Sequence, residues 1–126
     1  MFRPFLIGER GAVAGVDDRG GWRGLHPGTT RADLARAAVE GVANAVASAV
    51  ELLGSAQAEA PILLTGGGAR DGVVQQALAD ALGRPVRHVR LRSASAVGAA
   101  VLAARGAGVD LEPRREAGPL VEPSGR

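Results

Sequence analysis

The stretch Pro61–Gly72, with the sequence PILLTGGGARDG, decides how this chain folds. It starts with a short apolar segment that is too brief for a helix, so residues 60–65 are expected to form a buried strand. Three consecutive glycines follow, and after them comes the spacing of a helix over 70–82. Glycine allows positive φ and close approach to a ligand, and the first turn of a helix offers unpaired N–H groups. The stretch therefore predicts a strand, a glycine turn and a helix that together bind a phosphate or a nucleotide.

A long helix is expected before this unit. Residues 30–33 have the form of a capping box, and apolar side chains recur at helical spacing until Gly54. These signals predict a helix over 31–53. Residues 2–28 hold seven glycines and two prolines and are expected to be extended loop, with a short strand near Trp22.

Two further elements are expected after the unit. Residues 86–91 alternate apolar and polar side chains, which predicts a strand nearer the edge of the sheet. Ser93 or Ser95 can cap a helix over 95–105, and the small residues of that helix indicate that something packs tightly against it. Glycine, proline and charge dominate the end of the chain, so residues 109–126 are expected to be a disordered tail.

The resulting order of helix, strand, helix, strand and helix predicts an α/β fold with parallel strands and flanking helices. At 126 residues the chain is one domain at most. Two strands do not make a satisfactory parallel sheet, because such sheets are usually larger and covered on both faces. The chain is therefore expected to be a piece of a larger domain.

The composition excludes several classes of function. All fifteen basic residues are arginine, so neither a Schiff-base lysine nor a phosphate-loop lysine exists, and there is no cysteine for a disulfide or a thiolate metal site. The arginines are scattered among thirteen carboxylates, which does not favour nucleic-acid binding. No signal peptide and no stretch of about 20 apolar residues is present, so we expect a cytoplasmic protein without a membrane span.

The glycine turn leaves two alternatives open. Ala69, Arg70 and Asp71 follow the glycines where a phosphate loop needs Gly-Lys-Ser/Thr, so that interpretation fails. The spacing Gly66-x-Gly68-x-x-x-Gly72 is a loose relative of the dinucleotide fingerprint, in which an arginine after the next strand, Arg90 or Arg92, meets a 2′-phosphate. A tight turn without any ligand is the other alternative.

Other polar residues give weaker signals. His26 and His88 lack a partner at metal-ligand spacing and are expected at the surface or at a sheet edge. The adjacent pair Asp17-Asp18 suits a solvated turn better than a metal site. Glu40 and Asn44, one turn apart, are exposed helix residues or form a polar seam. No catalytic triad, paired carboxylates or metal-ligand set is predicted from spacing.

Six segments, taken in order, resemble the FGGY carbohydrate kinases, with the closest likeness to the bacterial xylulokinase branch. The segments are FLIGER at 5–10, RGGWRGL at 19–25, TRADLARAAVEGV at 30–42, GGGAR at 66–70, ADALGRPV at 79–86 and GAA at 98–100. The resemblance covers residues 2 to about 108. It implies that residues 1–108 are the later, nucleotide-side part of the second domain of an actin-like, ribonuclease-H-like ATPase fold.

The resemblance also implies the ligands. ATP with Mg²⁺ would donate its γ-phosphate to a sugar hydroxyl, and the adenosine end would lie on Gly66, Gly67, Gly68, Ala69, Arg70 and Asp71. Relatives often have Asn or Ser where this chain has Asp71, and a carboxylate only accepts hydrogen bonds. The sugar-binding residues, the catalytic aspartate and the other phosphate segments of the family have no counterpart here. The chain alone is therefore expected not to be catalytically competent, to bind sugar only together with the missing half, and to leave most contacts with Mg²⁺ to that half.

Three further expectations concern partners. The missing neighbours would leave apolar surfaces uncovered, which favours a complementary kinase fragment or a homo-oligomer. A non-catalytic interaction module is one alternative to the kinase interpretation. An NADP-type dinucleotide-binding fragment is the other.

Overall fold

The computed structural model describes residues 1–9, 11, 13–54, 60–91 and 93–125. Its main elements confirm the predicted order of helix, strand, helix, strand and helix. They are α1 (Arg31–Leu52), β3 (Ile62–Leu64), α2 (Gly72–Leu82), β4 (Val86–Arg90) and α3 (Ala94–Gly106). The other elements are the short strands β1 (Phe2–Arg3) and β2 (Gly21–Trp22), the 3-10 turn η2 (Gly68–Arg70) and the strand β5 (Glu116–Val121).

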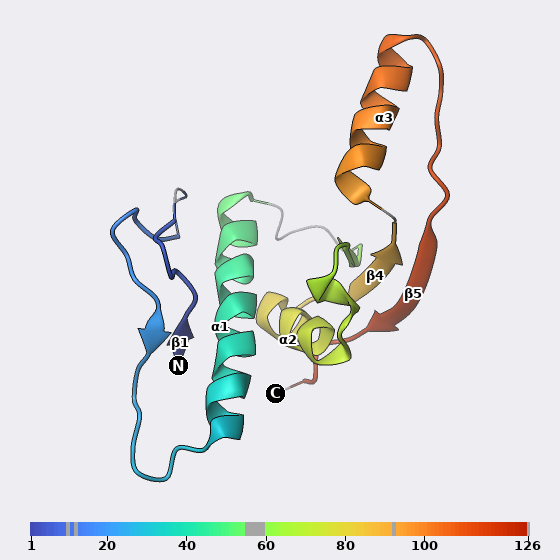
Figure 1. Ribbon diagram of the computed structural model, residues 1–126. Helices are drawn as coiled ribbons and strands as arrows, with labels where there is room; N and C mark the ends of the chain where they lie inside the picture. Colours follow the sequence, from blue (N-terminus) through green and yellow to red (C-terminus); the bar gives the residue numbers. More distant parts are fainter. Residues whose placement is uncertain (10, 12, 55–59, 92, 126) are drawn as a thin grey trace.

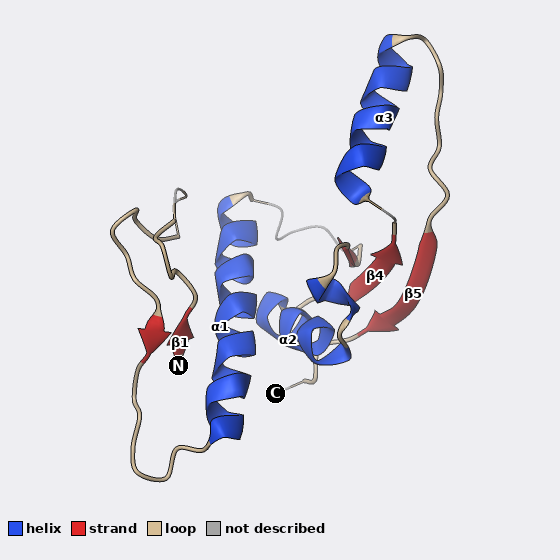
Figure 2. Cartoon of the chain, in the orientation of Figure 1, coloured by secondary structure: helices blue, strands red, loops and turns tan. Residues whose placement is uncertain are grey.

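The larger sheet of the described chain has the strand order β3-β4-β5, and Figure 2 shows β4 beside β5. Strands β3 and β4 are parallel, as predicted, whereas β5 pairs with β4 in the antiparallel direction. Two expectations are wrong. Strand β4 is the central strand of this sheet and not an edge strand, and residues 116–121 of the expected disordered tail form β5. Pro119 lies within β5 next to Gly118, where the register between β4 and β5 is interrupted. Proline has no N–H group to donate, so it is found in strands at edges and at bulges of this kind.

Helices α1 and α2 and the larger sheet are layered, with α2 between α1 and the strands (Figure 1). The core at this junction consists of Ala43 from α1, Leu78 and Ala79 from α2, and Val86 from β4. Ala79 and Val86 are fully buried, at 0% exposed surface. Because alanine fills so little space, the two helices can approach closely at Ala43 and Ala79.

Helix α1 starts with the predicted capping box. The Asp33 backbone N–H donates to Thr30 Oγ1 at 3.2 Å, and the Thr30 backbone N–H donates to Asp33 Oδ2 at 2.9 Å. Two N–H groups at the helix start are thereby satisfied. These hydrogen bonds lower the pKa of Asp33, and the one from the Thr30 backbone contributes most.

The N-terminal strands cover the side of α1 that faces away from α2 (Figure 1). The rings of Phe2 and Trp22 lie 4.6 Å apart, and Trp22 Nε1 donates to the Leu34 carbonyl oxygen at 3.2 Å. At Gly41 the strand comes so close to the helix that a Cβ would overlap the Phe2 carbonyl oxygen. Gly41 therefore allows β1 to pack directly on the backbone of α1.

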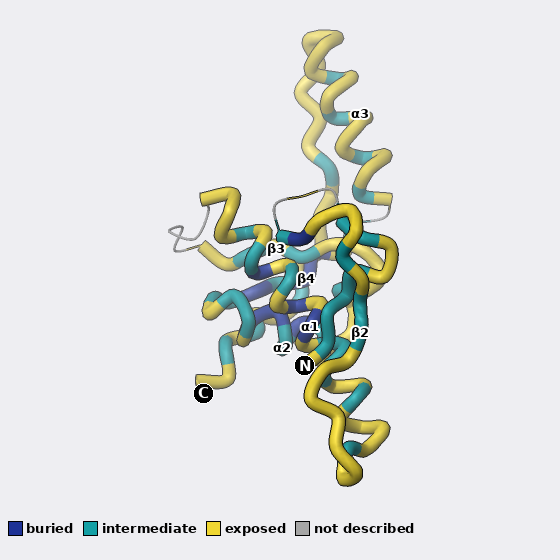
Figure 3. The backbone as a smooth tube through the Cα atoms, turned by 90° about the vertical axis from the view of Figure 1, so that its left-hand side faces the viewer, coloured by how far each residue is buried: buried dark blue, intermediate teal, exposed yellow. Residues whose placement is uncertain are grey.

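Helix α3 extends away from the rest of the molecule, and its residues are exposed or of intermediate burial (Figure 3). None of its residues is buried, and a Cβ at Gly98 would meet nothing within 4 Å. The tight packing expected against its small residues is thus not found among the described parts of the chain. Ser93 occupies the N-cap position, as one of the two predicted caps, but its side chain makes no capping hydrogen bond.

Candidate functional site

The glycine turn has the predicted position between a strand and a helix. Strand β3 ends at Leu64, and Gly66 has φ +101°, a conformation that side chains with a Cβ rarely adopt. Gly67 then starts the 3-10 turn, in which the Arg70 N–H donates to the Gly67 carbonyl oxygen at 3.2 Å. The prediction missed only this extra turn, which delays the start of α2 to Gly72.

The start of α2 is capped by the protein itself. Asp71 Oδ1 accepts hydrogen bonds from the backbone N–H groups of Val73 at 2.8 Å and Val74 at 3.3 Å. These N–H groups are therefore not free for a ligand, which corrects the expectation that the first helical turn offers them to a phosphate. The Asp71 carboxylate also places negative charge at this end of the helix. The turn consequently suits an uncharged part of a ligand better than a phosphate.

A side chain that the sequence analysis did not single out fixes the turn from behind. Gln75 is only 8% exposed, and its Nε2 donates to the Ala69 carbonyl oxygen at 2.8 Å. This hydrogen bond ties the 3-10 turn to the second turn of α2. In the sequence, Gln75 stands among the apolar positions of the predicted helix, and a polar residue at such a position is the signal that could have identified it.

An open groove of about 740 Å³ lies in front of the glycine turn, at the edge where the parallel strands β3 and β4 end. We call it the glycine-turn groove. Its lining comes from the turn, from β4 and the residues after it, from the start of α3 and from β5. The residues are Gly66, Gly67, Arg70, His88, Val89, Arg90, Leu91, Ser93, Ala94 and Glu116.

The groove brings together only part of the predicted nucleotide site. Gly66, Gly67 and Arg70 line it. Gly68 and Ala69 lie in the 3-10 turn but are not part of the lining, and the Asp71 carboxylate faces the start of α2. Arg90 lines the groove, whereas Arg92 lies outside the described residues.

His88 is the least expected member of the groove. The sequence analysis expected it at the surface or at a sheet edge, and this is wrong, because it is 8% exposed in the central strand of the sheet. Glu116 from β5 lies opposite Arg90 in the register of the two strands.

Ser93 of the groove has φ +52°, the one positive value among the described residues other than glycine. Strained backbone of this kind is common at ligand sites.

A second groove, of about 900 Å³, lies between α1 and α2. Glu40 and Asn44 both line it, and Arg36 Nε donates to Glu40 Oε1 at 2.7 Å. The rest of its lining is mostly alanine and valine. This groove does not include the glycine turn, so we do not assign the predicted ligand to it.

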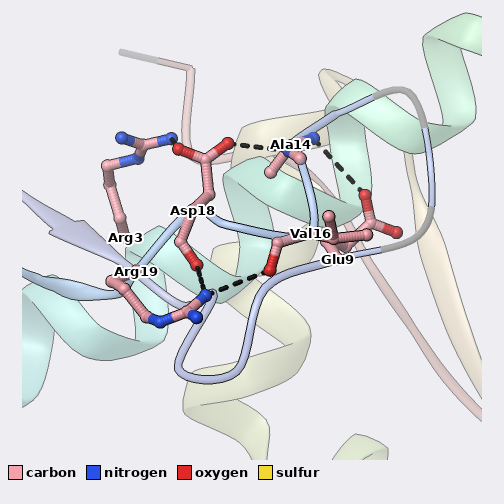
Figure 4. Close-up of polar contacts among 7 residues, drawn as sticks. Arg3, Glu9, Ala14, Val16, Asp18 and Arg19 are labelled. Carbon is pink, nitrogen blue, oxygen red and sulfur yellow. Dashed lines mark hydrogen bonds and ion pairs between the residues drawn. The ribbon is translucent and has the colours of Figure 1, made fainter.

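The Asp17-Asp18 pair belongs to a turn, in which the Asp18 N–H donates to the Gly15 carbonyl oxygen at 3.2 Å, and Figure 4 shows the polar contacts of Asp18. Asp18 Oδ1 lies 3.2 Å from Arg3 Nη2, and Asp18 Oδ2 accepts from the Gly15 N–H at 2.7 Å. The Gly15 hydrogen bond is the main reason that the pKa of Asp18 is lowered. Arg19 closes the turn by donating to two of its carbonyl oxygens.

The described residues offer neither a metal-binding cluster nor a membrane-spanning helix. No group of three or more His, Cys, Asp or Glu side chains is placed to hold a metal ion. No described helix has the length and apolar character needed to cross a membrane.

Comparisons with known proteins identify the family of this chain. Residues 1–107 match the model of the "FGGY family of carbohydrate kinases, C-terminal domain". Xylulose kinase of Staphylococcus epidermidis is 32% identical over 109 residues, which are 86% of this chain and 22% of that protein.

Solved structures of carbohydrate kinases have the same fold. The crystal structure of xylulose kinase from Rhodospirillum rubrum superposes with a TM-score of 0.75 at 30% identity, over 99% of this chain and 26% of that one. Glycerol kinase of Plasmodium falciparum, crystallised with ADP, superposes with a TM-score of 0.66 at 25% identity, over 85% of this chain and 22% of that one. The chain thus has the actin-like ATPase fold of these kinases and spans about a fifth to a quarter of their length.

Proposed function

Because the chain belongs to the C-terminal domain of the FGGY family of carbohydrate kinases, we propose that its glycine-turn groove holds the nucleoside end of ATP. The complete enzyme would transfer the γ-phosphate to a sugar hydroxyl. One observation carries this proposal: Gly66 and Gly67 open into a groove at the ends of two parallel strands. Crevices outside the carboxyl ends of such strands are the usual ligand sites of open α/β sheets.

The charges around the groove support the nucleoside end over the phosphates. Asp71 occupies the N–H groups at the start of α2, and Glu116 adds a second carboxylate to the groove wall. An uncharged base and ribose suit this wall, while the phosphates would extend toward the arginines or beyond the chain. Gly68, Ala69 and Asp71 contribute by shaping the glycine turn on which the nucleoside would lie.

Catalysis belongs to parts of the enzyme that this chain does not cover. The described residues contain no group of three or more His, Cys, Asp or Glu side chains that could hold a metal ion, and we assign most of the protein contacts with Mg²⁺ to the rest of the enzyme. Phosphoryl transfer needs positioning and charge stabilisation around the γ-phosphate. We therefore propose that the isolated chain does not catalyse the reaction, and that the complete enzyme works in the cytoplasm, where ATP is available.

The sugar is proposed from relatives alone. Xylulose is the first choice, because the relatives reported above include xylulose kinases. Glycerol is the second choice, because a glycerol kinase has the same fold.

Uncovered apolar surface favours a partner for this chain. Leu63 of β3 and Leu120 of β5 are 59% and 39% exposed, and Leu102 of α3 is 69% exposed. We propose that the remaining segments of the kinase domain cover these side chains. Sedimentation should show self-association of the isolated chain, and a well-behaved monomer that does not bind a hydrophobic dye would contradict this part of the proposal.

A nucleotide titration of the full 126-residue chain tests the groove. Backbone amide signals are followed by NMR while ATP or NADPH is added to millimolar concentration. We expect ATP to move the signals of Gly66 and Gly67 with a dissociation constant of about 1 mM or weaker, which corresponds to about 4 kcal/mol. NADPH acting at lower concentration than ATP would support the dinucleotide alternative. If neither nucleotide moves these signals, the proposed site is wrong.

A matched pair of glycine variants makes this test specific. Gly66→Ala and Gly83→Ala both place a Cβ at positive φ with nothing within 4 Å, so both should destabilise the chain by a similar amount, about 1–2 kcal/mol. Gly83 follows α2 at the end remote from the turn. We expect only Gly66→Ala to weaken ATP binding, and equal binding by both variants would count against the site.

A further inference from the structure

His88 is a largely buried polar residue in the wall of the glycine-turn groove. Its surface is 8% exposed, and its ring nitrogens are not among the fully buried side-chain atoms that lack a partner, so they are reached from the groove. Most buried polar side chains in proteins have a partner. The imidazole also contributes to the wall of the glycine-turn groove. A ligand in the groove can therefore replace water as the hydrogen-bond partner of the imidazole.

The strand pairing is irregular at this residue. Arg87 pairs with Leu120 and Val89 pairs with Ala117, so Gly118 and Pro119 of β5 lie opposite His88 alone and the extra residue of the bulge belongs to β5. Bulges are over-represented beside active sites. A Cβ at Gly118 would be 3.1 Å from the His88 carbonyl oxygen. The close approach of β5 therefore contributes to the burial of His88.

The surrounding charges restrict what His88 can bind. Glu116 comes from β5, Arg90 from β4 and Arg70 from the 3-10 turn, and all three line the same groove. No ion pair joins Arg90 to Glu116, although they face each other across the two strands. A carboxylate only accepts hydrogen bonds and repels a phosphate. A neutral group that can donate to Glu116 fits this end of the groove.

We propose that His88 hydrogen-bonds a ribose hydroxyl of the bound nucleotide, and that Glu116 accepts a hydrogen bond from the neighbouring hydroxyl. A neutral imidazole has one hydrogen-bond donor and one acceptor, and a hydroxyl group can pair with either of them. A cis-diol therefore satisfies the histidine in either tautomer and the carboxylate at the same time. This inference rests on the proposed function, because it names the part of ATP that the groove recognises.

The test compares ATP with its 2′-deoxy and 3′-deoxy analogues. Dissociation constants are measured by NMR titration of the full chain, and the readout is the ratio between ATP and each analogue. We expect the native chain to prefer ATP over at least one analogue by about 3- to 10-fold, the value of one hydrogen bond. His88→Leu should bring that ratio close to one, and His88→Gln should retain part of it. His26→Leu, which removes the other histidine of the chain, is the control and should leave the ratio unchanged.

Each outcome decides a separate point. Equal affinity of the native chain for all three nucleotides, or an unchanged ratio in His88→Leu, overturns the ribose assignment and leaves the ATP site intact. If His88→Leu does not fold, the imidazole signal of His88 in the His26→Leu chain replaces it, since His88 is then the single histidine. The imidazole signal of His88 should shift more with ATP than with the deoxy analogue that the native chain binds more weakly. Equal shifts overturn the assignment. No binding of any nucleotide overturns the proposed function itself.

Discussion

Replacing Gly41 by alanine should release the N-terminal strands from α1. Gly41 is buried in the middle of the helix, where an added Cβ would overlap the Phe2 carbonyl oxygen and lie 3.0 Å from the Phe2 carbonyl carbon. These are backbone atoms, so no side-chain rotation can relieve the overlap. Strand β1 must move away from the helix, and the contacts of Trp22 with Phe2 and Leu34 move with it.

Two opposing effects set the magnitude. Alanine stabilises a helix interior by about 1 kcal/mol relative to glycine. Overpacking a well-packed site destabilises by about 1–3 kcal/mol. We therefore expect Gly41→Ala to lower the free energy of docking of the N-terminal strands by up to about 2 kcal/mol. Gly98→Ala is the matched control, because Gly98 is also inside a helix but a Cβ there meets nothing within 4 Å. That variant should gain helix stability, by about 1 kcal/mol.

Urea unfolding measures both effects in one experiment. Trp22 is the single tryptophan of the chain, so its fluorescence reports the docking of β1 and β2 on α1, while circular dichroism reports the helices. We expect the fluorescence midpoint of Gly41→Ala to fall below that of the native chain. The fluorescence midpoint of Gly98→Ala should be unchanged. A fluorescence midpoint of Gly41→Ala at or above the native value would refute the reasoning.

Three more predictions follow from the caps and the C-terminal strand. Asp71→Ala should lower the free energy of unfolding by about 1 kcal/mol through loss of the helix cap, whereas Asp71→Asn should lose much less in the same urea assay. Because the folded-state pKa of Asp33 is lowered, its stabilising effect is complete above the unfolded pKa of about 4 and is lost as the pH falls through the folded pKa. Asp33→Asn should therefore make stability less dependent on pH in that range, and an unchanged acid titration would contradict this. Deleting residues 116–126 should uncover Val86 and lower the free energy of unfolding by about 2 kcal/mol, while an unchanged midpoint would mean that this segment is a tail after all.

Local sequence determined the elements whose contacts lie close along the chain. The capping box of Thr30 and Asp33 marks the start of α1, and the contacts that form it are three residues apart. The glycine turn was equally predictable, because an apolar segment followed by consecutive glycines leaves few conformations open. The family resemblance rests on such local segments, which is why it was visible without a structure.

The tertiary structure alone decided which residues share the groove. Strand β5 contains Gly118 and Pro119, which read locally as loop, and it forms because it pairs with β4, about thirty residues earlier in the chain. That pairing places β4 at the centre of the sheet, buries His88 and brings Glu116 to the groove. Burial and cross-strand register depend on which distant segment lies alongside a strand, and no local pattern specifies that partner. The glycine turn was therefore predictable from sequence, while the wall opposite it was not.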